Sequence, residues 1–130
     1  MIDPATEERL IAEATRSRGH AVSDRSGFAV GAAIEADDGR IFGGCNVENA
    51  TYGLTVCAER VAVWKALSEG VRRFRAVAVV TGADVPTPPC GACRQILWEF
   101  AGDVPVVSVT EGGSRKLYRM ADLLPEPFEF

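Results

Sequence analysis

The chain has 130 residues, of which 47% are hydrophobic and 25% are charged, enough apolar content for one domain spanning residues 1–130. Eighteen acidic residues against 14 lysines and arginines give a formal charge of −4, and an acidic domain binds polyanions poorly. No apolar run reaches the roughly 20 residues of a membrane span, and the N-terminus lacks the apolar core of a signal peptide. We therefore expect a cytoplasmic protein that binds neither nucleic acid nor membrane.

The first part of the chain predicts a helix followed by a β-hairpin. Asp3-Pro4 is typical of an N-cap and first helical residue, and Arg18-Gly19 is typical of a helix end. Residues 28–36 predict a strand, Asp38-Gly39 a tight turn, and residues 40–43 the returning strand.

The rest of the chain alternates helices and strands. Cys57 begins a mostly apolar helix that we expect to be buried, and Cys90 begins another. Residues 76–80 are apolar without alternation, which is typical of a central strand covered on both faces. Strands at 106–109 and 116–119 are joined by a link too short for a parallel crossover, so they pair antiparallel. We predict an α/β fold, a three-layer α/β/α sandwich around a mixed five-stranded sheet with an antiparallel C-terminal strand.

Two cysteine clusters carry the chemistry. Cys57 precedes Glu59 by two residues, and Cys90 and Cys93 form a Cys-x-x-Cys pair after two prolines. A structural zinc site closes with four protein ligands, whereas a catalytic site keeps three and leaves the fourth position to water. Both clusters also lie at predicted helix starts, where free N–H groups favour the thiolate. We predict one Zn²⁺ per chain, held by Cys57, Cys90 and Cys93.

Glu59 is the predicted catalytic proton shuttle. A carboxylate beside a zinc ligand can take a proton from zinc-activated water, deliver it to a ring nitrogen of the substrate and later protonate a departing amine. The alternative is an ordinary first-turn glutamate, favoured there by the helix dipole.

Cys45 and His20 are weaker candidates for the metal. Cys45 follows two glycines with no partner at finger-like spacing, which favours a small semi-buried apolar residue. His20 lies in a polar stretch far from both clusters, which favours a solvated or capping histidine. If Cys45 supplied a fourth ligand, the protein would be a structural zinc module without catalysis.

The zinc motifs belong to four blocks that resemble one known family. The other blocks are residues 26–33, 44–50 and 123–128, in the family's order. Together they resemble cytidine deaminases of the small, free-nucleoside type, within the wider class of zinc deaminases. The resemblance implies hydrolysis of cytidine and deoxycytidine to uridine and deoxyuridine with release of ammonia, in pyrimidine salvage. The antiparallel ending and a cysteine at position 57 resemble enzymes of free nucleosides rather than of polynucleotides.

The resemblance also implies substrate contacts. Asn46 and Glu48 match the pair that holds a ribose hydroxyl, and Phe28 matches the aromatic residue that packs against the pyrimidine. Ala58 matches a further substrate contact, and Tyr52 one contributed across subunits. Without the resemblance, the first two residues are equally well explained as a polar loop after a strand.

Three further residues enter through the same resemblance. Phe128 matches a C-terminal aromatic placed in a neighbouring subunit's site within a homotetramer, although it could equally fold back on its own core, as could Phe130. Arg60 resembles the arginine that donates hydrogen bonds to ligand sulfurs and offsets the negative charge of three thiolates on Zn²⁺. A surface arginine is the alternative. Arg25 departs from the family, which usually has tyrosine before Ser26.

Two other enzyme functions stay open beside the structural zinc module. A nucleic-acid editor is disfavoured by the acidic charge and the hairpin ending. A deaminase of a cytosine nucleoside antibiotic of the blasticidin kind shares the zinc motifs, but Asn46-Val47-Glu48-Asn49 favours the simpler nucleoside.

Overall fold

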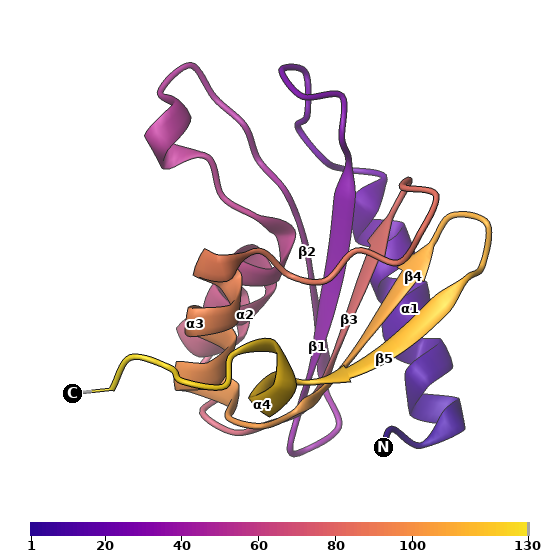
Figure 1. Ribbon diagram of the computed structural model, residues 1–130, viewed down its shortest axis with the longest axis vertical. Coiled ribbons are helices and arrows are strands. Elements are labelled where there is room, and N and C mark those ends of the chain that lie inside the picture. The colour runs from indigo at the N-terminus through magenta and orange to yellow at the C-terminus, as the bar shows by residue number, and fades with distance from the viewer. Residues whose placement is uncertain (130) are drawn as a thin grey trace.

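The computed structural model describes residues 1–129 and contains a mixed five-stranded sheet (Figure 1). The strand order is β2-β1-β3-β4-β5. Only β3 and β4 are parallel among these neighbours, so the predicted antiparallel C-terminal strand is confirmed. The strands are β1 (Val30–Ala36), β2 (Ile41–Cys45), β3 (Phe74–Thr81), β4 (Pro105–Thr110) and β5 (Arg115–Arg119). Phe130 lies outside the described residues.

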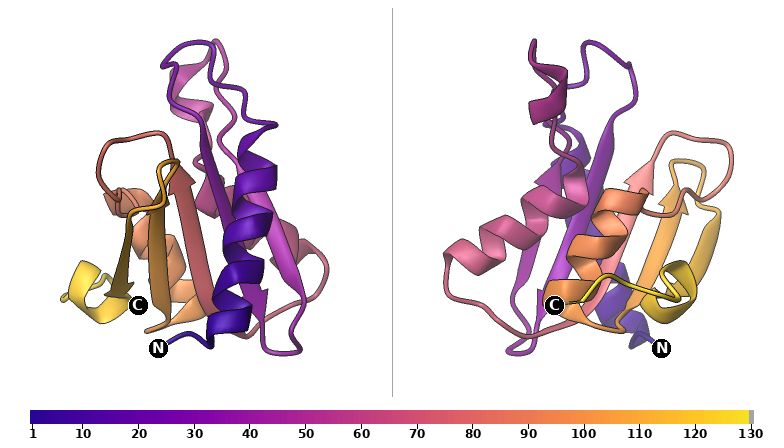
Figure 2. Two further views of the ribbon diagram at one scale, coloured as in Figure 1. Left: turned by 90° about the vertical axis from the view of Figure 1, so that its right-hand side faces the viewer. Right: turned by 60° about the vertical axis from the view of Figure 1, so that its left-hand side comes forward.

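Helices cover both faces of the sheet and confirm the three-layer prediction. Helix α1 (Pro4–Arg18) packs on one face, while α2 (Ala58–Ser68) and α3 (Gly91–Ala101) lie on the other (Figure 2). Two short helices, η1 (Tyr52–Leu54) and α4 (Met120–Leu123), were not predicted. No helix in the described part of the chain combines the length and the apolar content that a membrane crossing requires.

Helix α1 is set by its ends and by one buried side. The Asp3 carboxylate accepts the Thr6 N–H at 3.1 Å, which satisfies one of the free donors at the helix start. Leu10 and Ala14 are fully buried against the alanines and valines on that face of the sheet. Burial of this apolar side fixes the helix on the sheet, because propensity alone rarely stabilises a helix of this length.

Glycines let the helices approach the sheet closely. A Cβ on Gly31 would lie 1.9 Å from the Ala14 carbonyl oxygen in α1. A Cβ on Gly44 would lie 2.5 Å from the Ala62 nitrogen in α2. Both obstacles are backbone atoms, so neither helix could keep its position if the facing glycine gained a side chain. The position of α2 matters most, because its first turn carries part of the predicted site.

Element ends differ from the predictions where side chains replace backbone partners. Strand β1 begins at Val30 rather than at Phe28, because the Asn46 side chain holds the Phe28 carbonyl and Arg18 holds the Ala29 carbonyl. The returning strand runs two residues further than expected, to Cys45. The predicted burial of the helix after Cys57 holds at Ala58, Ala62, Val63 and Ala66 but not at Trp64, which is 43% exposed.

Candidate metal and active site

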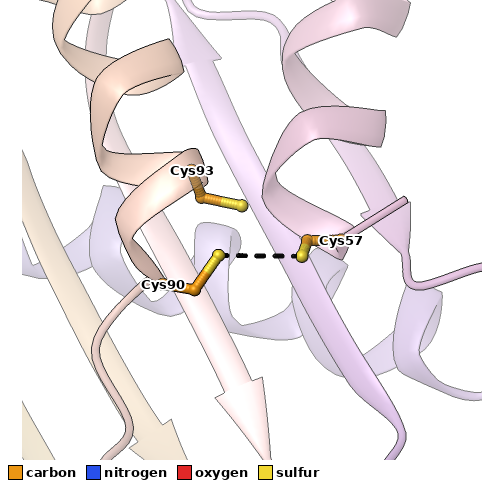
Figure 3. A group of neighbouring side chains, drawn as sticks. All are labelled: Cys57, Cys90 and Cys93. Carbon is orange, nitrogen blue, oxygen red and sulfur yellow. Dashed lines mark hydrogen bonds between the residues drawn. The ribbon is translucent and has the colours of Figure 1, made fainter. Parts of the chain in front are cut away.

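Three cysteine sulfurs meet between the starts of α2 and α3. Cys57 is the N-cap of α2, Cys90 is the N-cap of α3, and Cys93 lies in the first turn of α3. Their Sγ atoms all lie within 4.8 Å of one another, with 3.9 Å between those of Cys57 and Cys90 (Figure 3). The structure therefore brings together the three residues that the sequence predicted as one ligand set, although 33 positions separate the two N-caps.

The electrostatics of the cluster suit a bound cation. Hydrogen bonds from Cys93 first, and then from Arg60 and Cys90, lower the pKa of the Cys57 thiol to about 5. The pKa of Cys93 is raised, first because its thiol donates to Cys57 and then because it is buried. Mutual repulsion opposes the ionisation of three neighbouring thiols unless a cation lies between them. Three soft sulfur donors at helix N-termini fit zinc with one coordination position left open.

Glu59 is buried in the first turn of α2, beside the thiols. Its side chain is 6% exposed and lines the same pocket as Cys57 and Cys90. Burial is the largest cause that raises the pKa of Glu59 to about 7, and the charge of Cys57 adds to it, while the Glu59 backbone N–H and Arg60 oppose it. A carboxyl group with a pKa near neutrality can accept and release a proton with similar ease.

Arg60 faces the sulfur cluster rather than solvent. Its Nη2 lies 3.6 Å from the Cys57 Sγ and 3.4 Å from the Thr55 carbonyl oxygen. The guanidinium carbon lies 5.8 Å from the centre of the Trp64 ring, which supports the arginine from the outer side. Its Nε is buried without a hydrogen-bond partner among the described residues. A cation in the first turn opposes the helix dipole, and the neighbouring thiolate offsets that cost.

Two isolated bridges bring the polar loop after β2 next to the sulfur cluster. Val47 pairs antiparallel with Val56 through two backbone hydrogen bonds of 2.9 and 3.0 Å, and parallel with Val22 on its other side. Because Val56 precedes Cys57 and Val47 lies between Asn46 and Glu48, this pairing holds both polar residues beside the metal ligands. Local sequence patterns do not predict such single-residue bridges.

A pocket of about 270 Å³ opens beside Cys57 and Cys90, close to the size of small-molecule sites. Its walls include the predicted residues Phe28, Asn46, Glu48, Ala58 and Glu59. Sequence reasoning missed other residues of the same walls, namely Ser26, Val30, Thr55, Val56, Val79, Thr81, Thr87 and Pro88. Thr87 and Pro88 stand directly before the second zinc motif, and that adjacency was the one available signal for them.

The side chains of Asn46 and Glu48 line the pocket and also form hydrogen bonds to the backbone of the segments around it. The Asn46 amide donates to the Phe28 carbonyl and accepts the Val30 N–H, both at 2.9 Å. The Glu48 carboxylate accepts the backbone N–H groups of Arg25 and Ser26, each at 3.0 Å, and also the Ser26 hydroxyl. Hydrogen bonds from Ser26 are the main cause that lowers the pKa of Glu48, which keeps it ionised.

Tyr52 and Phe128 do not line this pocket. Tyr52 is 72% exposed on η1, and the Arg25 guanidinium carbon lies 5.4 Å from the centre of its ring. Arg25 and Tyr52 border a neighbouring hollow that shares Ser26, Glu48 and Thr55 with the pocket. Phe128 is 66% exposed, and its backbone N–H and carbonyl bond with the Gln95 side chain of α3. Within one chain neither aromatic ring reaches the pocket.

Cys45 and His20 lie outside the sulfur cluster. Cys45 ends β2 opposite Gly31, partly buried, and the metal-type grouping contains the other three cysteines without it. His20 is exposed just after α1, and its backbone N–H donates a hydrogen bond to the Ser17 carbonyl oxygen. This placement supports three protein ligands rather than four.

Comparison with known proteins agrees with this geometry. The family model for the cytidine and deoxycytidylate deaminase zinc-binding region matches residues 4–110, so the chain belongs to this zinc-dependent deaminase family. It is 48% identical over 122 residues to the cytidine deaminase of Sporosarcina psychrophila, covering 93% of this chain and 90% of that one.

A solved relative and a more distant one complete the comparison. The crystal structure of cytidine deaminase from Burkholderia pseudomallei superposes with a TM-score of 0.90 at 44% identity, covering 93% of this chain and 98% of that one. A blasticidin-S deaminase of Bacillus cereus is more distant, 33% identical over 57% of this chain and 59% of its own length. The chain is an aminohydrolase of this family, and its cofactor is zinc.

Zinc content should separate the ligands from the bystander cysteine. We expect about one zinc per chain in the wild-type protein and in Cys45→Ala, because the Cys45 sulfur lies outside the cluster. Cys90→Ala should lose most of the metal, since two thiolates rarely hold zinc tightly. Elemental analysis of the purified proteins checks both. Loss of zinc from Cys45→Ala would contradict the three-ligand assignment.

Proposed function

We propose that this protein deaminates free cytidine and deoxycytidine to uridine and deoxyuridine, with residues 1–130 acting as one deaminase domain. The observation that carries the proposal is a buried glutamate with a pKa near neutrality beside a three-thiol metal set, in a pocket of small-molecule size. The identity to cytidine deaminases over nine-tenths of the chain supports the same substrate. Three free thiols in one cluster suit a reducing compartment, and we place the reaction in cytoplasmic pyrimidine salvage.

In the proposed mechanism the chain holds a metal and moves protons. Cys57, Cys90 and Cys93 would hold Zn²⁺, which when bound supplies a Lewis acid that lowers the pKa of water in its open position towards about 7. Glu59 would take one proton from the attacking water and deliver it to the pyrimidine ring nitrogen. It would then take the proton of the hydroxyl added to the ring carbon and pass it to the amino group, which leaves as ammonia. Burial suits Glu59 to both transfers, because it raises the pKa of this carboxyl group to about 7.

Arg60 and the pocket walls would support these steps. Arg60 donates towards the Cys57 sulfur and draws electron density from it, which reduces the negative charge that three thiolates place on the metal. Phe28 packs against the pyrimidine, Ala58 contacts its edge, and Glu48 with Asn46 holds the ribose hydroxyl. Glu48 remains ionised in the pocket wall, as an acceptor of a hydroxyl hydrogen bond should be.

The site is further proposed to be shared between subunits of a homotetramer. Tyr52 and Phe128 are exposed and do not line the pocket of their own chain, and a neighbouring copy could bring them to its own pocket. Trp64 on α2 and Val47 in the neighbouring loop after β2 add exposed apolar surface, which association would cover.

Glu59→Gln should separate chemistry from metal binding. The variant should keep its fold and its zinc but lose the proton shuttle, so kcat should fall by about 10²–10⁴-fold. An ultraviolet assay of uridine formation from cytidine measures the rate. Glu35→Gln is the matched control, because Glu35 is buried to a similar degree, 5% exposed, but lies on β1 outside the pocket. Comparable turnover by both variants would show that Glu59 is only a helix-start residue.

The sugar contacts should set the substrate class. Free cytosine and cytidine within single-stranded nucleic acid should be poor substrates, because each lacks the free hydroxyl that Glu48 is proposed to bind. Glu48→Ala should lower kcat/KM for cytidine on the order of 10–100-fold, and it should narrow the difference in kcat/KM between cytidine and cytosine.

Ser26→Ala is the control for that experiment. It removes the loop hydroxyl that bonds to Glu48 but keeps the carboxylate, so the ratio between cytidine and cytosine should stay near its wild-type value. Equal rates of deamination of cytosine, cytidine and an oligonucleotide by the unmodified protein would refute the proposal that its substrates are free nucleosides.

Complementation between inactive variants tests the shared site. Phe128→Ala and Glu59→Gln should each be nearly inactive alone while retaining zinc. Co-expressed as mixed tetramers, they should regain activity, because some pockets then combine an intact Glu59 with an intact Phe128 from a neighbour. Glu126→Ala, in the same tail, should stay active. Mixed assemblies no more active than their parents, or an active monomer by light scattering, would refute the shared site.

A further inference from the structure

The loop between β3 and α3 forms one wall of the pocket, yet it has few backbone donors of its own. Its final stretch, Pro86-Thr87-Pro88-Pro89, contains three prolines, which lack an N–H, so only Thr87 can donate. Thr87 and Pro88 line the pocket, and the metal ligand Cys90 follows immediately. A segment of this composition cannot be held by an ordinary backbone ladder and must be held through its carbonyl groups.

Side chains from other elements provide that hold. The Ser108 hydroxyl of β4 donates to the Thr87 carbonyl oxygen at 2.6 Å, across 21 residues of chain. The Arg94 Nε of α3 donates to the Pro89 carbonyl oxygen at 2.7 Å. Arg94 also donates a hydrogen bond to the Leu123 carbonyl oxygen, so it does not serve the loop alone. Among the described residues, the Ser108 hydroxyl bonds to the loop only.

Ser108 is also an unusual residue for its position in β4, and its hydrogen bond to the loop explains why a serine lies there. It is fully buried in a strand that otherwise contributes valines to both cores, and it pairs with Val79, which forms part of the pocket wall. A buried hydroxyl needs a partner to offset its desolvation, and serine is a weak strand former. The other buried hydroxyls at this end of the sheet, Thr81 and Thr110, accept N–H groups from turns next to their own strands.

We propose that Ser108 is a positioning residue of the active site, which fixes the proline-rich loop as a preformed wall of the substrate pocket. The proposal rests on the proposed deaminase function and adds to it a residue outside the metal and substrate sets. Without the hydroxyl, the Thr87 carbonyl loses its partner, the loop samples other positions, and binding of the nucleoside must reorder it. That cost falls on substrate binding more than on the proton transfers at Glu59.

The test is Ser108→Ala, with Ser17→Ala as the matched control. Ser17 is also buried, and its hydroxyl bonds to the Glu13 carboxylate on α1, on the opposite face of the sheet from the pocket. Both variants lose a buried hydroxyl and one hydrogen bond. We expect KM for cytidine to rise on the order of tenfold in Ser108→Ala, with a smaller change in kcat and full zinc content, and to stay unchanged in Ser17→Ala.

Amide hydrogen exchange provides a readout that does not depend on the substrate. Exchange across residues 82–90 should be faster in Ser108→Ala than in the wild-type protein, and unaltered in Ser17→Ala. A KM within about twofold of wild type, or unchanged exchange in this loop, would overturn the proposal. If the wild-type protein failed to deaminate cytidine, the proposed function would be refuted, and exchange alone would decide whether Ser108 holds the loop.

Discussion

The convergence of two helix N-termini is the constraint on which the rest of the site depends. Helices α2 and α3 lie on the same face of the sheet and direct their first turns at one another, which brings three sulfurs within 4.8 Å. The positive ends of both helices favour thiolates there, and the glycine at position 44 lets α2 lie close enough to the sheet for this alignment. The packing of α2 and α3 on this face of the sheet therefore brings the three thiols together and also buries Glu59, which raises the pKa of its carboxyl group.

The pocket walls illustrate how irregular backbone is stabilised beside an active site. Loops have polar groups that no ladder satisfies, so side chains must satisfy them. Asn46 bonds to the start of β1, Glu48 to the loop before it, and Ser108 to the loop before α3. Two of these three side chains also face the pocket. In the proposed function Asn46 and Glu48 would both position the loops and bind the substrate, so a substitution at either residue should alter both.

Charge is distributed in agreement with this chemistry. The chain is acidic as a whole, yet the sulfur cluster has an arginine against it, and the guanidinium is supported by a tryptophan ring. This local cation offsets repulsion among the thiolates where it is greatest. A second arginine, at position 25, lies over the Tyr52 ring, and its backbone N–H donates to Glu48 in the pocket wall.

The sequence by itself determined the mixed sheet with its antiparallel ending, the three-layer arrangement and the candidate ligands. Apolar runs, turn residues and a short link between the last two strands are local signals, and metal ligands in a Cys-x-x-Cys pair lie close in sequence. The sequence also grouped Cys57 with that pair, and the tertiary structure brings the three sulfurs within 4.8 Å of one another. Only the tertiary structure decided that Glu59 is buried and that Val47 bridges Val56 to bring the polar loop beside the sulfurs. The tertiary structure also revealed the hydrogen bond from Ser108 to the loop before α3, whereas in the sequence Ser108 is only one serine among valines. Each of these depends on contacts between segments far apart in the chain, and such contacts leave no periodic or local signal in one sequence.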